Sequence, residues 1–196
     1  MAMSIPYETT GRTRQKARTR AAMIAATRAF LADGATPTVE QAAERAGVSR
    51  TTAYRYFPNQ RALLVATYPM VGTDSLLDDD APDDPRERLE IVTDAIGEQL
   101  LENEAELRSM LRLSLDPTSR DKLPLRTGRA VRWIEDALAP LRDTLSETEL
   151  RRLVLSIRAA VGIEPLVWLT DIAGLPRDEA VALMRDSART LLLAAL

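Results

Sequence analysis

Two arginines and two tyrosines lie within seven consecutive residues of this sequence, in the segment RTTAYRY at positions 50–56. The whole chain contains only four Tyr, two Phe and two Trp, so aromatic rings are locally concentrated here. The hydroxyl groups of Tyr54 and Tyr56 can donate to phosphate oxygens while the rings pack on protein. The guanidinium groups of Arg50 and Arg55 can pair with O6 and N7 of guanine, or equally with phosphate. The segment is therefore a candidate nucleic-acid contact, with ordinary surface tyrosines as the alternative.

A pair of short helices is predicted to position these side chains. Thr38 and Gln41 have the spacing of a capping box, which predicts a helix over residues 39–46. Gly47 can adopt the left-handed conformation that reverses the chain. Ser49 can then cap a second helix, which carries the RTTAYRY segment. This layout is typical of a helix-turn-helix, in which the second helix is free to enter a DNA major groove.

Positive charge is concentrated around this pair of helices. Residues 1–61 contain ten Lys or Arg and four Asp or Glu, whereas the rest of the chain contains 16 and 25. A basic head on an acidic body indicates a polyanionic partner for the head, although charge alone is more typical of a solvated face. The segment GRTRQKARTR (residues 11–20) carries a base at every even position. We expect its start to be disordered without DNA, and Arg12 and Arg14 to reach into a minor groove.

The composition argues against most other classes of function. The chain has no Cys and no His, so it lacks thiol chemistry and the commonest metal ligand and general base. We therefore expect no enzymatic activity, no metal and no cofactor. No purely apolar run is longer than residues 191–196, far short of a membrane span, and the N-terminus lacks the apolar region of a signal peptide. We expect a cytoplasmic protein with no membrane partner.

The periodicity predicts an all-α fold of about nine helices, because no stretch alternates like a strand. We expect two domains: a helix-turn-helix DNA-binding domain over residues 1–60, and an effector-binding and dimerisation domain over residues 61–196. An acidic linker with two prolines, residues 73–88, is expected between them. The remaining helices are expected over residues 13–33, from Asn59, and over 84–103, 104–115, 123–141, 146–172 with a kink at Pro165, and after Pro176 to 195.

Residues 18–65 resemble the DNA-binding domain of TetR-family transcriptional regulators. The family's pattern has a first helix with Ala-Ala-x-x-x-Phe-x-x-x-Gly, then a Gly-Val-Ser turn, then Tyr-x-x-Phe. The matching residues are Ala25, Ala26, Phe30, Gly34, Thr38, Ala43, Ala46, Gly47, Val48, Ser49, Thr52, Tyr54, Phe57, Leu63 and Leu64. The stretch GIEPLVWLTD (residues 162–171) also looks like one common in actinobacterial members.

The resemblance implies a homodimer that binds a near-palindromic, double-stranded DNA operator. Such a regulator usually represses, and it is released when a small-molecule effector occupies the C-terminal domain. Gln60 stands where the family has a lysine that touches phosphate, so a charge is lost there, and Thr51 stands where glycine is common. The residues that the resemblance places at DNA are Thr38, Ser49, Arg50, Thr51, Thr52, Tyr54, Arg55, Tyr56 and Gln60.

The C-terminal part gives less specific signals. Candidate ligand-binding residues are Leu107, Met110, Leu111, Trp133, Arg158 and Trp168, with plain core as the alternative for the apolar ones. Arg158 and Glu164 can form a buried pair, orient a ligand or lie at a dimer interface. The last two helices are apolar over more than one face, which suits a four-helix dimer interface between two copies.

Two other interpretations remain open at this point. A helical enzyme would need carboxylates, and the obvious cluster, residues 78–84, lies in the expected linker, where positioned acid–base chemistry is not favoured. The same cluster lacks the glycine-punctuated loop of a calcium site. Alternatively, a helical protein–protein adaptor can keep the fold without binding an operator.

Overall fold

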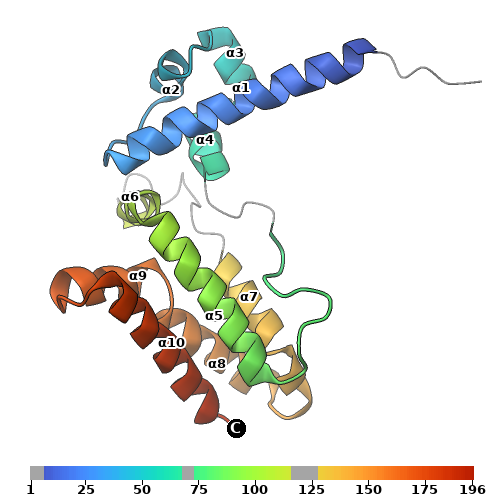
Figure 1. Ribbon diagram of the computed structural model, residues 1–196, viewed down its shortest axis with the longest axis vertical. Helices are drawn as coiled ribbons and strands as arrows, with labels where there is room; N and C mark the ends of the chain where they lie inside the picture. The colour runs from blue at the N-terminus through green and yellow to red at the C-terminus, as the bar shows by residue number, and fades with distance from the viewer. Residues whose placement is uncertain (1–6, 68–72, 116–127) are drawn as a thin grey trace, which may run out of the picture. The chain divides into compact units, whose positions relative to one another are not determined.

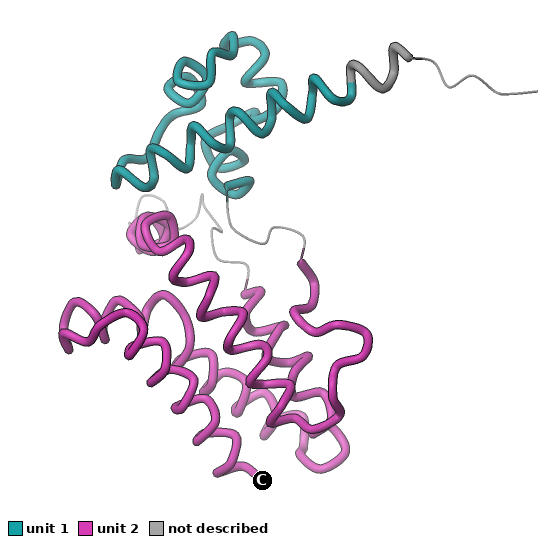
Figure 2. The backbone as a smooth tube through the Cα atoms, in the orientation of Figure 1, with its two compact units in different colours: residues 1–71 teal, residues 72–196 magenta. Residues whose placement is uncertain are grey.

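The computed structural model describes residues 7–67, 73–115 and 128–196, with side chains from residue 13 onward. Every regular element within these ranges is a helix, as the sequence predicts. The chain forms two compact units, residues 1–71 and 72–196 (Figure 2). This division falls later than the expected boundary after residue 60, because the fourth helix packs against the first.

The first unit consists of α1 (Tyr7–Ala32), α2 (Val39–Arg45), α3 (Arg50–Tyr56) and α4 (Gln60–Thr67) (Figure 1). Its core is built from small residues of α2 and α3 and larger residues of the other elements. The buried members are Met23, Val39, Ala42, Ala43, Ala53, Phe57 and Leu63. The alanines let the short helices cross closely, and Phe57 fills the space behind α3.

Helix α1 begins earlier than the sequence analysis expects, at Tyr7 rather than near Thr13. The basic segment 11–20 is therefore helical, and the expectation of disorder at its start is wrong for the structure described here. The physical reason is composition: α1 has no proline, and Ala, Arg, Gln and Lys are strong helix formers. The start of α1 extends beyond the other helices of its unit (Figure 1).

The second unit contains α5 (Pro85–Glu102), α6 (Glu104–Leu115), α7 (Arg129–Ala137), α8 (Glu147–Ala160), α9 (Ile163–Val167) and α10 (Arg177–Leu193). A 3-10 turn (Ala139–Asp143) follows α7, and a π-helical turn (Trp168–Ile172) follows α9. Helix α5 packs against α7 and α10, and α10 packs against α8. The core of the unit lies among these four helices, with Val92, Ile134, Val154 and Ile157 fully buried.

Residues 73–84, inside the expected linker, contain no helix and are held by the second unit. The indole Nε1 of Trp133 donates to the carbonyl of Thr73 (3.1 Å), and Ser75 Oγ donates to Asp136 (2.5 Å). Asp84 caps α5 as predicted, since its carboxylate accepts from the backbone N–H of Arg86 (2.9 Å). The segment is therefore attached to the second unit over its described length.

Two expected helices of this unit differ in extent. The start of the helix expected over residues 123–141 lies outside the described residues. Its described part ends at Ala137, because Pro140 follows in a tighter 3-10 turn. The helix expected over 146–172 breaks at Gly162, where φ is +144°, instead of kinking at Pro165. Pro165 lies in the first turn of α9, where a missing N–H is tolerated because first-turn N–H groups have no intrahelical partner.

The stretch Glu147–Ile172 has a mean hydropathy of 1.6 in its most apolar window, enough by length and composition to cross a membrane. This is weak support for a span, because 44% of that window is buried inside the protein and the break at Gly162 interrupts the helix.

Candidate nucleic-acid interface

Local capping bonds fix the two short helices that carry the candidate site. Thr38 and Gln41 form the predicted capping box: the Gln41 N–H donates to Thr38 Oγ1 (3.2 Å), and the Thr38 N–H donates to Gln41 Oε1 (2.8 Å). Gly47 has φ +65°, the left-handed conformation that the turn requires. Ser49 then caps α3 by accepting from the Thr52 N–H (3.3 Å). These bonds give α3 a defined start and direction.

Helix α3 presents one polar face and buries the other. Ala53 is 0% exposed and Phe57, its C-cap, is 2% exposed, so both anchor α3 to the core. The exposed residues are Arg50, Thr51, Tyr54 and Arg55, and Thr52 and Tyr56 are half-buried. With 3.6 residues per turn, positions 50, 51, 54 and 55 lie on one side of the helix. The structure therefore brings the predicted donors together on a single solvent-facing surface.

Glu40 of α2 holds two of these donors. Its carboxylate accepts a hydrogen bond from the Tyr54 hydroxyl (2.6 Å) and pairs with Arg50 Nη2 (3.1 Å). The bond from Tyr54 lowers the pKa of Glu40 and raises the pKa of Tyr54, because it favours the ionised carboxylate and the neutral phenol. Arg50 nevertheless keeps 75% of its side chain exposed. Glu40 thus orients Arg50 and Tyr54 and accepts from donor groups that would otherwise face solvent.

Sequence reasoning did not single out Glu40. Its partners lie 10 and 14 residues further along the chain, on a different helix, so no short spacing marks them. Glu40 could have been noticed as an acidic residue within a basic segment. However, it lies in the first turn of α2, where an acidic side chain is ordinarily explained by its interaction with the helix dipole.

The remaining predicted contacts have different surroundings. The guanidinium of Arg55 lies over the ring of Tyr56, 5.6 Å from its centroid, and Tyr56 packs against the core cluster. Gln60 is half-buried, and its Nε2 donates to the carbonyl of Pro37 (2.8 Å), which ties α4 to the segment before α2. Arg14 is exposed on α1. Arg12 also belongs to α1, but its side chain lies outside the described residues.

The candidate ligand-binding residues of the second unit differ in exposure. Leu107, Met110 and Trp133 are buried and Leu111 is half-buried, whereas Trp168 is 58% exposed. Two hollows described in this unit have other linings. One lies between α5 and α10, and the other involves α7, α8 and the turn between them. None of the six candidates lines either hollow.

Arg158 bridges the break between α8 and α9. Its Nη1 donates to the carbonyl of Val161 (2.9 Å), and its Nη2 pairs with Glu164 (3.2 Å). The guanidinium lies directly above Gly162, because a Cβ built there would be 2.5 Å from Arg158 Nη1. The predicted Arg158–Glu164 pair is therefore present, and it connects the two helices on either side of the break at Gly162.

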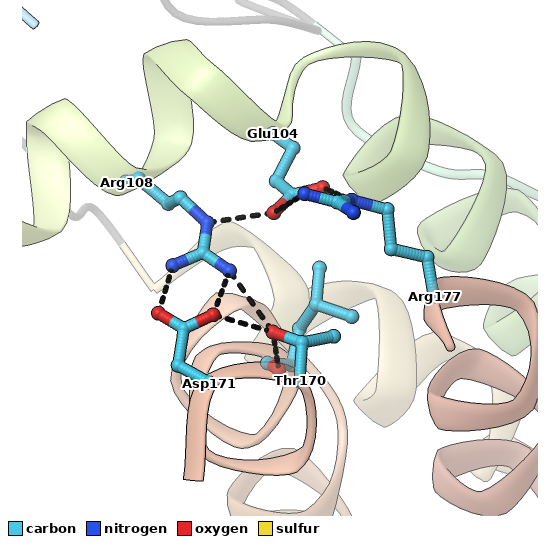
Figure 3. Close-up of polar contacts among 6 residues, drawn as sticks. Glu104, Arg108, Thr170, Asp171 and Arg177 are labelled. Atoms are coloured by element: carbon cyan, nitrogen blue, oxygen red, sulfur yellow. Dashed lines mark hydrogen bonds and ion pairs between the residues drawn. The ribbon is translucent and has the colours of Figure 1, made fainter. Parts of the chain in front are cut away.

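A second polar cluster, the α6 network, links three elements of this unit (Figure 3). Arg108 donates to both carboxylate oxygens of Asp171 (2.6 and 2.8 Å), to Thr170 Oγ1 (3.0 Å) and to Glu104 (2.6 Å). Arg177, at the start of α10, also pairs with Glu104. The network thereby joins α6 to the π-helical turn and to α10. Sequence reasoning missed it, because the partners from the other elements lie 63 and 73 residues away from α6.

The pKa values of this network follow its pairing. The hydrogen bonds from Arg108 lower the pKa of Asp171. Partial burial opposes ionisation of Glu104, but the bonds from Arg177 and Arg108 prevail and lower its pKa. The bond to Asp171 raises the pKa of Arg108. All these groups are therefore charged at neutral pH. Among the described residues, no cluster of three Asp or Glu side chains could hold a metal ion.

Comparisons with known proteins agree with this geometry. Residues 23–67, from the middle of α1 to the end of α4, match the family model described as "Bacterial regulatory proteins, tetR family". The chain is also similar in fold to the crystal structure of a TetR transcriptional regulator from Rhodococcus sp. RHA1, with a TM-score of 0.55 and 20% sequence identity. That similarity covers 92% of this chain and 98% of the other. No curated protein matches the chain in a sequence search.

Proposed function

We propose that this chain is a DNA-binding regulator of the TetR family, a repressor whose homodimer binds a near-palindromic operator in the cytoplasm. The match of residues 23–67 to the family model supports this proposal. A small-molecule effector, bound in the second unit, releases the repressor from the operator. We propose no catalytic role for the chain, since the polar clusters described above are ion pairs that hold helices together.

The observation that carries this proposal is the polar face of α3. Arg50, Thr51, Tyr54 and Arg55 are exposed together on a short helix that Ala53 and Phe57 anchor to the core. A recognition helix needs this combination, because its donors must reach base edges and phosphates while its backbone stays fixed. The excess of positive charge in residues 1–61 favours the same partner.

Dimerisation through α8 and α10 is supported by exposed apolar side chains on both helices. Leu155 of α8, and Leu183 and Leu193 of α10, are large and exposed, although the two helices pack together through their other faces. Two helices from each copy can bury these residues in a four-helix interface. The dimer would then present two α3 helices, which must lie about 34–36 Å apart to enter successive major grooves.

Release follows from differential binding. The dimer has one state in which the two α3 helices fit the operator and another in which their separation differs. An effector that binds the second state more tightly lowers operator affinity, at most by the ratio of its affinities for the two states. Leu107, Met110, Leu111, Trp133, Arg158 and Trp168 stay candidates for its site.

The test uses DNA selected by the full-length protein from a random-sequence duplex pool. The double variant Arg50→Ala, Tyr54→Phe should lose at least about 100-fold in affinity for the selected site, since it removes hydrogen bonds to charged or polar DNA groups. Fluorescence anisotropy measures the affinity, and far-UV circular dichroism checks that the helices are intact. Failure to select any sequence, or unchanged affinity in the double variant, would favour the adaptor interpretation instead.

A further inference from the structure

A hollow between α1 and α3 lies next to the polar face of α3. Three of its lining residues, Thr52, Arg55 and Tyr56, are predicted DNA contacts, but the hollow itself was not predicted as a binding site. Its volume is about 360 Å³. We call it the α1–α3 hollow, and its lining residues are Gln15, Lys16, Thr19, Thr52, Arg55 and Tyr56. Three of these six belong to α1, so the hollow combines the recognition helix with the basic helix that precedes it.

The lining of the hollow contains hydrogen-bond donors of several kinds and no carboxylate. Lys16 brings an ammonium group, Arg55 a guanidinium and Thr52 a hydroxyl group. The hydroxyl of Thr19 already donates to the carbonyl of Gln15 (3.1 Å). Thr52 Oγ1 already accepts from Ser49 Oγ (2.9 Å), so its own proton is directed elsewhere. Such a set matches a single anion with several acceptor oxygens, which is the chemistry of a phosphate group.

The two cations of the hollow differ from Arg50 in their partners. Arg50 is engaged by Glu40, and Arg45 by Asp33. In the part of the chain that the structure describes, neither Lys16 nor Arg55 is paired with a carboxylate. An incoming phosphate therefore meets two cations that need not first give up an internal ion pair.

We propose that the α1–α3 hollow binds one backbone phosphate of the operator in each half-site, with Lys16 and Arg55 as its charged contacts. This inference rests on the proposed function, in which α3 enters a major groove and side chains that flank it contact the phosphates along the groove. It adds a phosphate contact by Lys16 to the minor-groove contacts expected of Arg12 and Arg14 on the same helix. Lys16 thereby becomes a DNA-contacting residue, although neither the helix-turn-helix motif nor the polar face of α3 includes it.

The experiment pairs a protein substitution with a neutral phosphate. Duplexes carrying one methylphosphonate at each successive backbone position of the selected operator are titrated with wild-type protein and with Lys16→Ala. For one position per half-site, wild type should lose about tenfold in affinity, the effect of a hydrogen bond to a charged group. Lys16→Ala should show part of that loss with the natural duplex. Its further loss with the same methylphosphonate should be smaller than the loss of wild type, because only Arg55 still supplies a charged contact there.

Two further variants make the assignment specific. Lys16→Arg keeps the charge and should keep the sensitivity to that methylphosphonate. Arg18→Ala removes a cation of α1 that does not line the hollow, and it should leave the sensitivity unchanged. Removing Lys16 should also reduce the slope of log affinity against log salt by about 0.9 for each phosphate that the side chain neutralises.

Several results would overturn the inference. Equal sensitivity of wild type and Lys16→Ala at every position would show that Lys16 contacts no phosphate. A rise in thermal stability with inorganic phosphate that depends on Lys16, without coupling to any duplex position, would assign the hollow to a free anion. If wild type bound no duplex at all, the proposed function itself would fail, and that outcome is distinguishable because it does not depend on Lys16.

Discussion

At the scale of single residues, the candidate interface contains its own competitor for DNA. The carboxylate of Glu40 accepts from Tyr54 and pairs with Arg50, two of the groups proposed to bind DNA. Binding must exchange these contacts for contacts with phosphates or base edges. DNA of another sequence offers Arg50 and Tyr54 fewer well-placed acceptors than the operator does, so it compensates less well for their lost contacts with Glu40. We therefore expect Glu40 to weaken non-specific binding more than operator binding.

Substitution of Glu40 by Gln tests this role. The variant removes a negative charge that faces DNA and weakens the hold on Arg50, so affinity for non-specific duplex should rise several-fold, by about 1 kcal/mol. The ratio of operator to non-specific affinity should fall. Fluorescence anisotropy with selected and scrambled duplexes measures both values. If both affinities stay at their wild-type values, Glu40 has no such role.

Local signals explain which parts of this site could be predicted. Thr38, Gln41 and Ser49 act on neighbours within three residues, so their capping bonds follow from spacing alone. Glu40 reaches Tyr54 only because α2 and α3 cross in a particular way, and no sequence spacing encodes that crossing. The exposure of α3 donors was predictable from helical periodicity, whereas the pairing of one of them with an acid was not.

At the scale of elements, close approach between helices depends on individual small residues. Gly97 of α5 is buried, and a Cβ built at this position would lie only 2.7 Å from Val181 Cγ1 of α10. Valine in a helix has essentially one rotamer, so Val181 cannot easily turn away. Gly97 therefore sets the distance between α5 and α10, which together form a large part of the core of the second unit.

Gly97→Ala should therefore destabilise the protein although alanine favours a helix. The gain in helix propensity of about 1 kcal/mol should be outweighed by overpacking, for a net loss of about 1 kcal/mol in the free energy of unfolding. In the Val181→Ala background the same Gly97→Ala change should cost less, because the clashing methyl group is gone. Urea denaturation followed by circular dichroism measures both. A stabilised single variant would contradict the tight crossing.

The α6 network predicts how stability depends on pH. The folded-state pKa values of Glu104 and Asp171 lie below their ordinary values of 4.5 and 3.8. Their stabilising contribution is therefore fully present above those ordinary values, and it is lost as the pH falls through the lower folded-state values. The contribution of these two groups to the melting temperature should be constant from about pH 7 to pH 5 and should decline below about pH 4.5.

The variant Arg108→Ala isolates this contribution. It should lower the melting temperature at about pH 7, because Asp171 and Glu104 lose their shared partner, and the difference from wild type should narrow below about pH 3.5. Thermal scans followed by circular dichroism across this range measure the difference. Arg132→Ala, a change at an exposed arginine of α7, serves as the control. A difference that stays constant with pH would show that the network does not contribute through its charges.

Long-range contacts also limited prediction at this scale. The break in the helix expected over 146–172 lies at Gly162 and not at Pro165, because proline is acceptable in a first turn while the backbone at Gly162 has left the helical region. Arg158 then bridges the break. Pro165 thus predicted an interruption within three residues of the observed break, but the break itself is at Gly162. Its position depends on where α9 begins.

At the scale of the whole molecule, the two units differ in charge and in proposed role. The first unit carries the excess of cations and the polar face of α3, and the second carries the exposed apolar residues of α8 and α10. In a dimer formed by the second unit, two α3 helices are linked and can bind the two half-sites of one operator. Because two linked contacts give a higher affinity than one, we expect a monomer to bind the operator only weakly.

The all-α class and the two-part organisation were predictable, because helical periodicity and the shift from basic to acidic composition are properties of the sequence. The boundary between units was not, since it depends on α4 packing against α1. The site proposed for an effector was not predictable either. Large apolar residues such as Met110 and Trp133 have the same sequence signature whether they form core or line a pocket.

The most direct test of the central claim is DNase footprinting of the full-length protein on its selected operator, repeated over a series of salt concentrations. We predict a protected site with two-fold symmetry, whose half-sites lie about one DNA turn apart and whose protection weakens steeply as salt increases. Protection without symmetry, or affinity that does not change with salt, would contradict a dimeric repressor that binds through the polar face of α3.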